Sequence, residues 1–302
     1  MWRNSPKLDL LNQELMITIF TNPRPFKEPF DRIQRNAISS WLHLDPKCEI
    51  LLCEDEEGTT KNVAKELGVG YIPEVKTTEF GTPLINDVFK KAQELASYDT
   101  VAQINTDIIL MNDFPAAVKT VQSLMNNKPF LMVGRRWDLL ISELIDFDEQ
   151  GNWKSIIQKN LLQSGTLHGL SGMDYWVFQK ETLNPPGFVV GRPGIDTWLV
   201  YEARRQQIPV IDATPSVKII HQSHNYPNQA KDYFGIEKKR NQKLSGKFQS
   251  LSLRDATFLL EKNRLTQPPF PRNIIHKVSL WKTWQVLLFT KRTLRTIISK
   301  IL

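Results

Sequence analysis

The stretch Leu84–Asp107, LINDVFKKAQELASYDTVAQINTD, joins a helix pattern to a strand pattern. Apolar residues recur at helical spacing over Leu84–Ser97, and Thr100–Ile104 is an apolar run of strand length. Asn105-Thr106-Asp107 follows this run directly, so the predicted strand ends in polar side chains. A helix that leads into a strand, with a carboxylate where the strand ends, is typical of an α/β fold that binds a ligand at the sheet edge.

The same alternation continues on both sides of this stretch, without an internal repeat. Strand patterns are followed by polar or proline-rich loops, and one helix pattern ends at Gly68, a common residue after a last helical turn. The predicted strands are Leu15–Thr21, Glu49–Cys53, Phe130–Arg135, Tyr175–Phe178 and Val217–Ile220. The predicted helices are Phe30–Trp41, 59–67, Trp153–Leu162 and Asp196–Arg205, and 138–148 reads as a bent strand or hairpin. This order predicts a doubly wound, mostly parallel α/β sheet flanked by helices over residues 13–265.

Polar residues follow several of the predicted strands. Thr21 ends the first, Glu54 and Asp55 follow the second, and Asn105 and Asp107 follow Thr100–Ile104. Ligands gather at the carboxyl ends of the strands in open α/β sheets, so we expect these residues to face one crevice. Hard divalent cations such as Mg²⁺ or Mn²⁺ are bound by carboxylates together with phosphate oxygens. Asp107 is therefore a candidate metal ligand.

Further candidates lie in the second half of the chain. His221 and His224 come just after the predicted strand Val217–Ile220, where neutral imidazoles can bind a metal or order a loop through hydrogen bonds. Asp196 begins a predicted helix, so its carboxylate is either an N-terminal cap or a general base. Asp174, after a glycine-punctuated loop, is the rival base, and Arg135 has the guanidinium fork that suits a diphosphate.

Together these residues resemble the GT-A glycosyltransferases, whose Asp-x-Asp motif holds a divalent ion on the donor diphosphate. Asn105 stands where the motif has its first Asp, which leaves Asp107 as the better ligand. The resemblance implies that His221 or His224 completes a Mn²⁺ or Mg²⁺ site with Asp107. The box HQSHNY, residues 221–226, is similar to a signature of a little-described bacterial and plant group of GT-A-like proteins.

The resemblance also implies a reaction, the transfer of a sugar from a nucleoside diphosphate sugar to an unidentified sugar, lipid or protein acceptor. Residues implied to bind the donor are Thr21, Glu54, Asp55, Asn105 and Arg135. Asp196 would be the base if the reaction inverts the anomeric centre, with Asp174 as the rival or an acceptor-positioning residue. A noncatalytic nucleotide-binding or membrane-associated scaffold of the same fold is the alternative, because the first motif carboxylate is absent.

Charge separates the chain into a neutral body and a basic tail. The formal net charge is +7, and residues 272–302 hold seven Lys and Arg residues and no Asp or Glu. A neutral body argues against nucleic-acid binding. Apolar residues at helical spacing in the tail predict a basic amphipathic helix that contacts a membrane surface or packs on the body. With two cysteines and no apolar leader segment, the sequence predicts a cytoplasmic protein, peripheral at the inner face of a membrane if the tail binds lipid.

Overall fold

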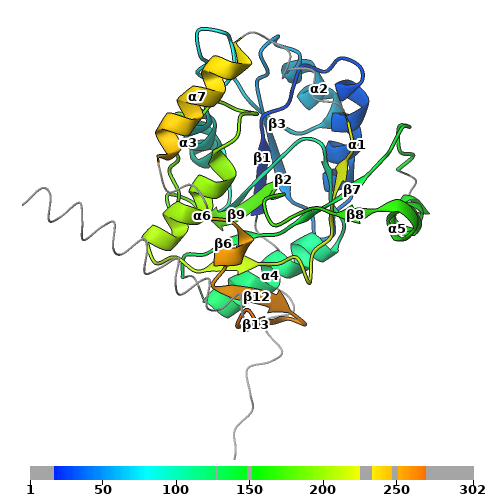
Figure 1. Ribbon diagram of the computed structural model, residues 1–302. Helices are drawn as coiled ribbons and strands as arrows, with labels where there is room; N and C mark the ends of the chain where they lie inside the picture. Colours follow the sequence, from blue (N-terminus) through cyan, green and yellow to red (C-terminus); the bar gives the residue numbers. More distant parts are fainter. Residues whose placement is uncertain (1–16, 127, 148–151, 225–232, 247–250, 270–302) are drawn as a thin grey trace, which may run out of the picture.

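The computed structural model describes residues 17–126, 128–147, 152–224, 233–246 and 251–269, which form two β-sheets with helices packed around them (Figure 1). The nine-stranded sheet has the order β13 (Arg264–Thr266), β12 (Phe258–Glu261), β10 (Val210–Asp212), β6 (Leu131–Val133), β9 (Tyr175–Gln179), β4 (Thr100–Ile104), β1 (Ile17–Thr21), β2 (Glu49–Cys53) and β3 (Gly70–Ile72). The four-stranded sheet has the order β5 (Ile108–Ile109), β11 (Ile219–Gln222), β7 (Arg136–Leu139) and β8 (Thr166–Leu167). The helices are α1 (Phe30–Leu42), α2 (Thr60–Leu67), α3 (Ile85–Leu95), α4 (Asp113–Met125), α5 (Asn152–Ser164), α6 (Ile195–Arg205) and α7 (Phe234–Ser245).

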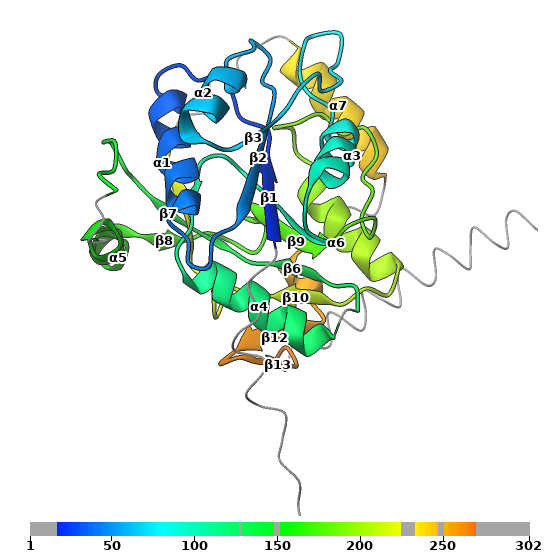
Figure 2. The ribbon, with the colours of Figure 1, turned by 180° about the vertical axis from the view of Figure 1, so that it is seen from behind.

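The large sheet is mostly parallel, as predicted. Strands β3, β2, β1 and β4 run parallel to one another, and so do β6, β10 and β12. The exception inside the sheet is β9, which pairs antiparallel with both β4 and β6. At one end, β13 closes the sheet as an antiparallel hairpin with β12 (Figure 2). The architecture is therefore a mixed α/β fold with a large, mostly parallel sheet flanked by helices.

Both faces of the large sheet are buried, which explains why its strands are apolar throughout. Alternate residues of β1 point to opposite faces, so that Ile17 and Ile19 pack in the cluster that includes α1 and α4. Phe20 points the other way, into the cluster that includes α3 and α6. Burying each such side chain contributes roughly 1.5–3 kcal/mol to stability. Figures 1 and 2 show α1 and α2 on one side of the central strands and α3, α6 and α7 on the other.

The small sheet has its own apolar cluster, in which α5 contributes Trp153, Ile157 and Leu161. Two predictions are corrected here. The predicted strand or hairpin at 138–148 is a short strand, β7, which begins at Arg136 and ends at Leu139. The predicted strand at 217–220 begins later, at Ile219, runs to Gln222 and belongs to the small sheet, so that His221 lies within the strand.

The predicted basic tail, residues 272–302, lies outside the described residues, and so do Asn225 and Tyr226 of the HQSHNY box. No helix in the described part of the chain is both long and apolar enough to span a bilayer.

Candidate active site and metal centre

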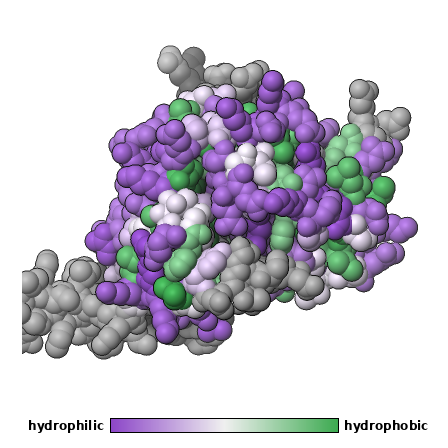
Figure 3. Space-filling model, turned by 90° about the horizontal axis from the view of Figure 1, so that it is seen from above, coloured by the Kyte–Doolittle hydropathy of each residue, from purple (hydrophilic) through white to green (hydrophobic). Residues whose placement is uncertain are grey.

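The ends of β1, β2 and β4 meet at one edge of the large sheet. The Thr21 hydroxyl lies 2.9 Å from the hydroxyl of Thr106, and the Asn22 amide donates a hydrogen bond of 2.9 Å to the Glu54 carbonyl. The face of the molecule above these strand ends is largely hydrophilic (Figure 3). The strand ends therefore adjoin one another, as the parallel order predicts.

Asp107, His221 and His224 come together beside this edge. The chain turns after β4 into β5, which pairs antiparallel with β11 in a register that sets Ile108 opposite His221. The Gln222 backbone N–H donates to the Asp107 carbonyl over 3.1 Å, which fixes Asp107 next to the histidines. The distance from Asp107 Oδ2 is 3.5 Å to His221 Nε2 and 3.1 Å to His224 Nε2. One ligand atom from each of the three residues lies within 4.8 Å of the others.

The three side chains fit a divalent transition ion. The second carboxylate oxygen, Asp107 Oδ1, is buried and makes no hydrogen bond to any described residue. A buried polar atom without a partner is costly unless something else satisfies it. Two imidazoles and one carboxylate form a mixed N/O donor set, which suits Mn²⁺ better than Mg²⁺, because Mg²⁺ is bound mainly by oxygen.

Electrostatics within the cluster favour an ionised carboxylate. Burial alone would raise the pKa of Asp107, but hydrogen bonds and charge from His221 and His224 outweigh it and hold that pKa well below its usual range. Burial is the largest single influence on the pKa of His221 and lowers it, but the hydrogen bond to Asp107 and the negative charges of Asp107 and Asp174 together raise the pKa above its usual value. A cation bound by these residues would take the place of the protons on the imidazoles.

Asn105 points toward Asp174 in the structure. Asn105 Nδ2 donates a 2.7 Å hydrogen bond to Asp174 Oδ1, and the Asn105 backbone N–H donates to the Asp174 carbonyl over 3.0 Å. Arg136 holds the same carboxylate, with its Nη1 at 3.2 and 3.1 Å from the two oxygens. Burial raises the pKa of Asp174 although Arg136 opposes the shift. The amide at position 105 therefore holds a buried carboxylate that lies beside the metal cluster.

Asp196 lies in the first turn of α6, as its second residue. Both roles expected from the sequence, an N-terminal cap and a general base, stay predictions. The side chain of Asp196 is half-buried. Burial, and then the negative charge of Asp174, raise the pKa of Asp196 to about 7. A carboxylate with this pKa can accept a proton at neutral pH.

Glu54 and Asp55, predicted to bind the donor, have their carboxylates in other contacts. Asp55 Oδ2 accepts hydrogen bonds from the backbone N–H groups of Thr59 and Thr60, at 2.8 and 2.7 Å, and from both of their hydroxyls. Glu54 accepts a hydrogen bond from the Tyr71 hydroxyl. The Asp55 carboxylate therefore accepts hydrogen bonds from backbone N–H groups at the start of α2. Donor binding by Glu54 and Asp55 stays a prediction.

Arg135 Nε donates a 2.7 Å hydrogen bond to the His168 carbonyl, and donor binding by Arg135 stays a prediction. Sequence reasoning missed two residues of the site, Asp138 and His168. Asp138 lies between three cationic or imidazole groups, with Oδ1 at 2.9 Å from both His221 Nδ1 and Arg136 Nε, and Oδ2 at 2.7 Å from His168 Nδ1. Burial raises the pKa of Asp138, and these neighbours lower it by more. Only the strand register could have revealed this cluster.

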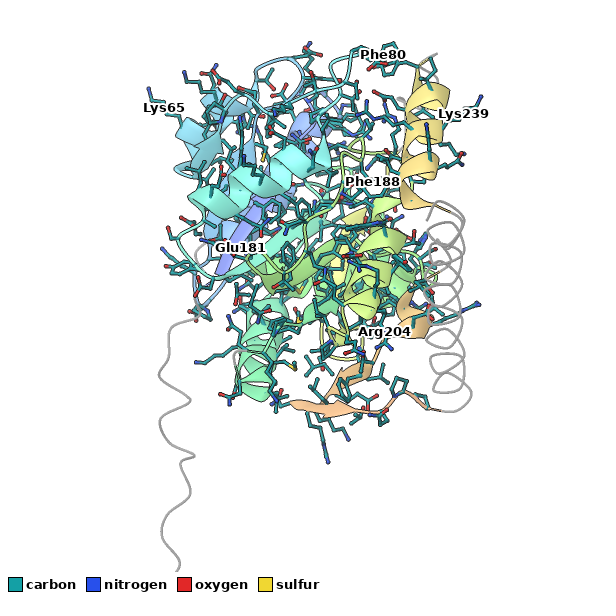
Figure 4. The ribbon with its side chains drawn as sticks, turned by 90° about the vertical axis from the view of Figure 1, so that its left-hand side faces the viewer. Lys65, Phe80, Glu181, Phe188, Arg204 and Lys239 are labelled. Atoms are coloured by element: carbon teal, nitrogen blue, oxygen red, sulfur yellow. The ribbon has the colours of Figure 1, made fainter. Side chains whose placement is uncertain are left out.

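A small hollow, with a volume of about 60 Å³, opens next to the strand ends. It begins one residue beyond Thr21, with Asn22 and Arg24, and continues over Glu56, Arg192 and Tyr233. Figure 4 shows Phe80 at the top of the molecule beside α7, and its ring stacks on Tyr233 with 4.9 Å between centroids. The hollow is therefore bounded by the loop after β1 and by the segment that leads into α7.

Comparisons with known proteins give no family assignment. The sequence matches no protein-family model and no curated protein. Among solved structures, glucosyl-3-phosphoglycerate synthase of M. tuberculosis is 16% identical, with 75% of this chain and 77% of that chain covered and a TM-score of 0.40. The same enzyme in complex with Mn²⁺, UDP and glucosyl-3-phosphoglycerate is 16% identical, with 80% and 84% covered and a TM-score of 0.41. A mycobacterial protein is 15% identical over 75% and 72%, with a TM-score of 0.41. These values are too low to carry a functional argument, which rests on the site itself.

Proposed function

We propose that this protein is a metal-dependent glycosyltransferase that moves a sugar from a nucleoside diphosphate sugar to an acceptor hydroxyl. The observation that carries the proposal is the convergence of Asp107, His221 and His224 at the carboxyl edge of the sheet, around a buried carboxylate oxygen without a hydrogen-bond partner in the described chain. A carboxylate and two imidazoles at this edge can hold a divalent cation that also binds a diphosphate.

Asp107, His221 and His224 would hold the ion, each through one ligand atom, and Mn²⁺ fits this donor set best. When bound, the ion supplies positive charge that neutralises the charge developing on the departing diphosphate. Neutralising this charge is the one role that we assign to the ion.

Asp196 would take the proton from the acceptor hydroxyl as that oxygen attacks the anomeric carbon. Its pKa of about 7 leaves it ionised in a large share of molecules at neutral pH, so it can act as a base. Asp174, held by Asn105 and Arg136, would keep the pKa of Asp196 high through its own negative charge. A base of this kind supports an inverting reaction.

The hollow beside the strand ends is the proposed site for the nucleoside of the donor. It adjoins Thr21, whose hydroxyl contacts the residue before Asp107, so a nucleotide in the hollow would have its diphosphate near the metal residues. Asn22, Arg24 and Glu56 line it and offer both hydrogen-bond donors and acceptors to a base and a ribose. Donor binding by Glu54, Asp55 and Arg135 stays a prediction, because their side chains make other contacts.

A noncatalytic nucleotide-binding scaffold is the second candidate. The amide of Asn105, in place of a motif carboxylate, favours it. Membrane contact through residues 272–302 also stays a prediction, which liposome flotation of the full chain and of a chain ending at residue 271 would test.

The test of the enzyme is release of nucleoside diphosphate from a panel of sugar nucleotides, with Mn²⁺, Mg²⁺ or EDTA. We would compare the wild-type protein with Asp107→Ala and with a matched control, Asp99→Ala. Asp99 is an exposed carboxylate just before β4, whereas Asp107 follows the end of the same strand. We expect release from one donor that depends on Mn²⁺, is lost in Asp107→Ala and is kept in Asp99→Ala.

Two other outcomes would contradict the proposal. Calorimetric binding of a nucleotide without turnover would favour the noncatalytic scaffold. If the protein neither releases nucleoside diphosphate nor binds any nucleotide in Mn²⁺, both candidate functions are wrong.

A further inference from the structure

His221 is held from both sides of its ring. Its Nε2 faces Asp107 Oδ2 at 3.5 Å, and its Nδ1 lies 2.9 Å from Asp138 Oδ1. The His221 side chain is almost completely buried, with 4% of its surface exposed. Two carboxylates therefore flank this ring, one beside each nitrogen.

The backbone sets this geometry. Strands β7 and β11 pair in parallel, with Asp138 the register partner of His221, so the two residues are neighbours across the strands. On the other side, β8 pairs with β7, and His168 follows β8 directly. Asp138 therefore lies on β7, between β11 and β8, with His221 on one side and His168 on the other.

The Asp138 carboxylate is itself fixed. Oδ2 is taken by His168 Nδ1 at 2.7 Å, and Oδ1 is shared between His221 and the Nε of Arg136. Since both oxygens have partners, the carboxylate cannot turn without breaking an ion pair or a hydrogen bond. The 2.9 Å ion-pair contact places the negative charge of Asp138 beside His221 Nδ1, which favours a proton on that nitrogen.

We infer that Asp138 is the positioning residue of the metal centre: it keeps the proton of His221 on Nδ1, so that the Nε2 lone pair points at the cation. The inference rests on the proposed function, because it concerns the ion that Asp107, His221 and His224 would hold. Metal-binding histidines commonly donate their other N–H to a carboxylate, and loss of this partner weakens metal affinity by roughly 10–100-fold. Asp138 acts through His221 and is not itself a ligand.

The experiment measures Mn²⁺ affinity of the full-length protein by titration with Mn²⁺ alone, followed by electron paramagnetic resonance of the free ion. The variants are Asp138→Ala, Asp138→Asn and His221→Ala, with Asp107→Ala as the reference for loss of a ligand. Asp31→Ala is the matched control, since Asp31 also pairs with an arginine, Arg35, but on α1. Thermal unfolding of each variant reports whether it folds.

We expect Asp138→Ala to weaken Mn²⁺ binding by roughly 10–100-fold, and Asp138→Asn to weaken it less, because the amide oxygen can still accept from Nδ1–H. If Asp138→Ala does not fold, Asp138→Asn carries the test. In the His221→Ala background, Asp138→Ala should cause no further loss, because the residue through which it acts is gone. Asp31→Ala should bind Mn²⁺ like the wild-type protein.

Two results would overturn the inference while leaving the proposed function intact. The first is wild-type affinity in both Asp138 variants, with only the unfolding temperature lowered, which is what a purely structural ion pair would give. The second is an equal further loss in the His221→Ala background, which would make Asp138 an independent ligand. If the wild-type protein itself binds no Mn²⁺, the proposed metal centre and the inference are both wrong.

Discussion

Restoring the missing carboxylate of the motif, Asn105→Asp, should harm the protein. The Asn105 amide donates to Asp174 Oδ1 over 2.7 Å, so an Asp at this position would face another buried carboxylate. The substitution removes a hydrogen bond to a charged group, worth about 1.5–3 kcal/mol. It also adds repulsion of about 5 kcal/mol, if both groups are ionised about 3 Å apart at an effective dielectric constant near 20.

A shared proton limits this cost. Two adjacent carboxylates retain one proton to a higher pH than either would alone, so the folded variant binds a proton that the unfolded chain has released. Between the unfolded pKa near 4 and the raised folded pKa, the free energy of unfolding therefore falls as the pH rises, by about 1.4 kcal/mol per pH unit. Relative to wild type, we expect a loss of about 1 kcal/mol at pH 5 and about 5 kcal/mol at pH 8.

The assay is urea unfolding followed by tryptophan fluorescence, at pH 5 and pH 8 in EDTA, so that no cation screens the pair. Asn105→Ala is the matched control, because it removes the hydrogen bond without adding a charge. It should lose about 1.5–3 kcal/mol at both pH values. Equal stability of the two variants at both pH values would refute the account of Asn105 as the partner of Asp174.

Three further predictions concern the base, an ion pair and a close contact. Asp196→Asn should lower the turnover number by about 10²–10⁴-fold, and the wild-type rate should rise with pH through about 7 as Asp196 loses its proton; a rate independent of pH from 5 to 9 would contradict this. Arg192→Met should cost about 3–5 kcal/mol in urea unfolding, because Glu237, 2.5 Å from the guanidinium, would be left buried and charged; a loss below about 1 kcal/mol would contradict it. Gly134→Ala should cost about 1–3 kcal/mol in thermal unfolding, since a Cβ there would lie 2.6 Å from the hydroxyl of the buried Tyr175; an unchanged midpoint would show that the tyrosine can move.

Local patterns predicted much of the fold. Strands Glu49–Cys53 and Thr100–Ile104 have the predicted bounds, because each is an apolar run bounded by polar residues. Helix α2 ends at Gly68, whose φ of 67° is left-handed, as a glycine after a helix predicts. The direction of β9 was not predictable, since an apolar run reads the same in a parallel and an antiparallel strand. The two-residue strand β5 is too short to give a pattern at all.

The candidate site likewise contains residues that local patterns predict and residues that depend on strand pairing. Asp107 could be proposed because it follows a buried strand, and His221 and His224 because of the resemblance. The role of Asp138 depends on the pairing of β7 with β11 in a given register, and no pattern along the sequence specifies which strand lies beside which. Donor binding by Glu54 and Asp55 was inferred from their position after a strand. That position does not reveal that Asp55 is fully occupied by the start of α2.

The small sheet has a consequence for how the site is made in the cell. Its members β5 and β11 are separated by more than a hundred residues of sequence, yet Asp107 meets the histidines only through their pairing. A ribosome delivers the chain from the N-terminus, so β1, β2 and β4 can pair on the nascent protein long before β11 exists. A chain released after Asp212 would keep those three strands and Asp107 but lack both imidazoles. The candidate metal centre is therefore completed only after β11 has been synthesised, and termination before β11 would yield a partly folded chain without it.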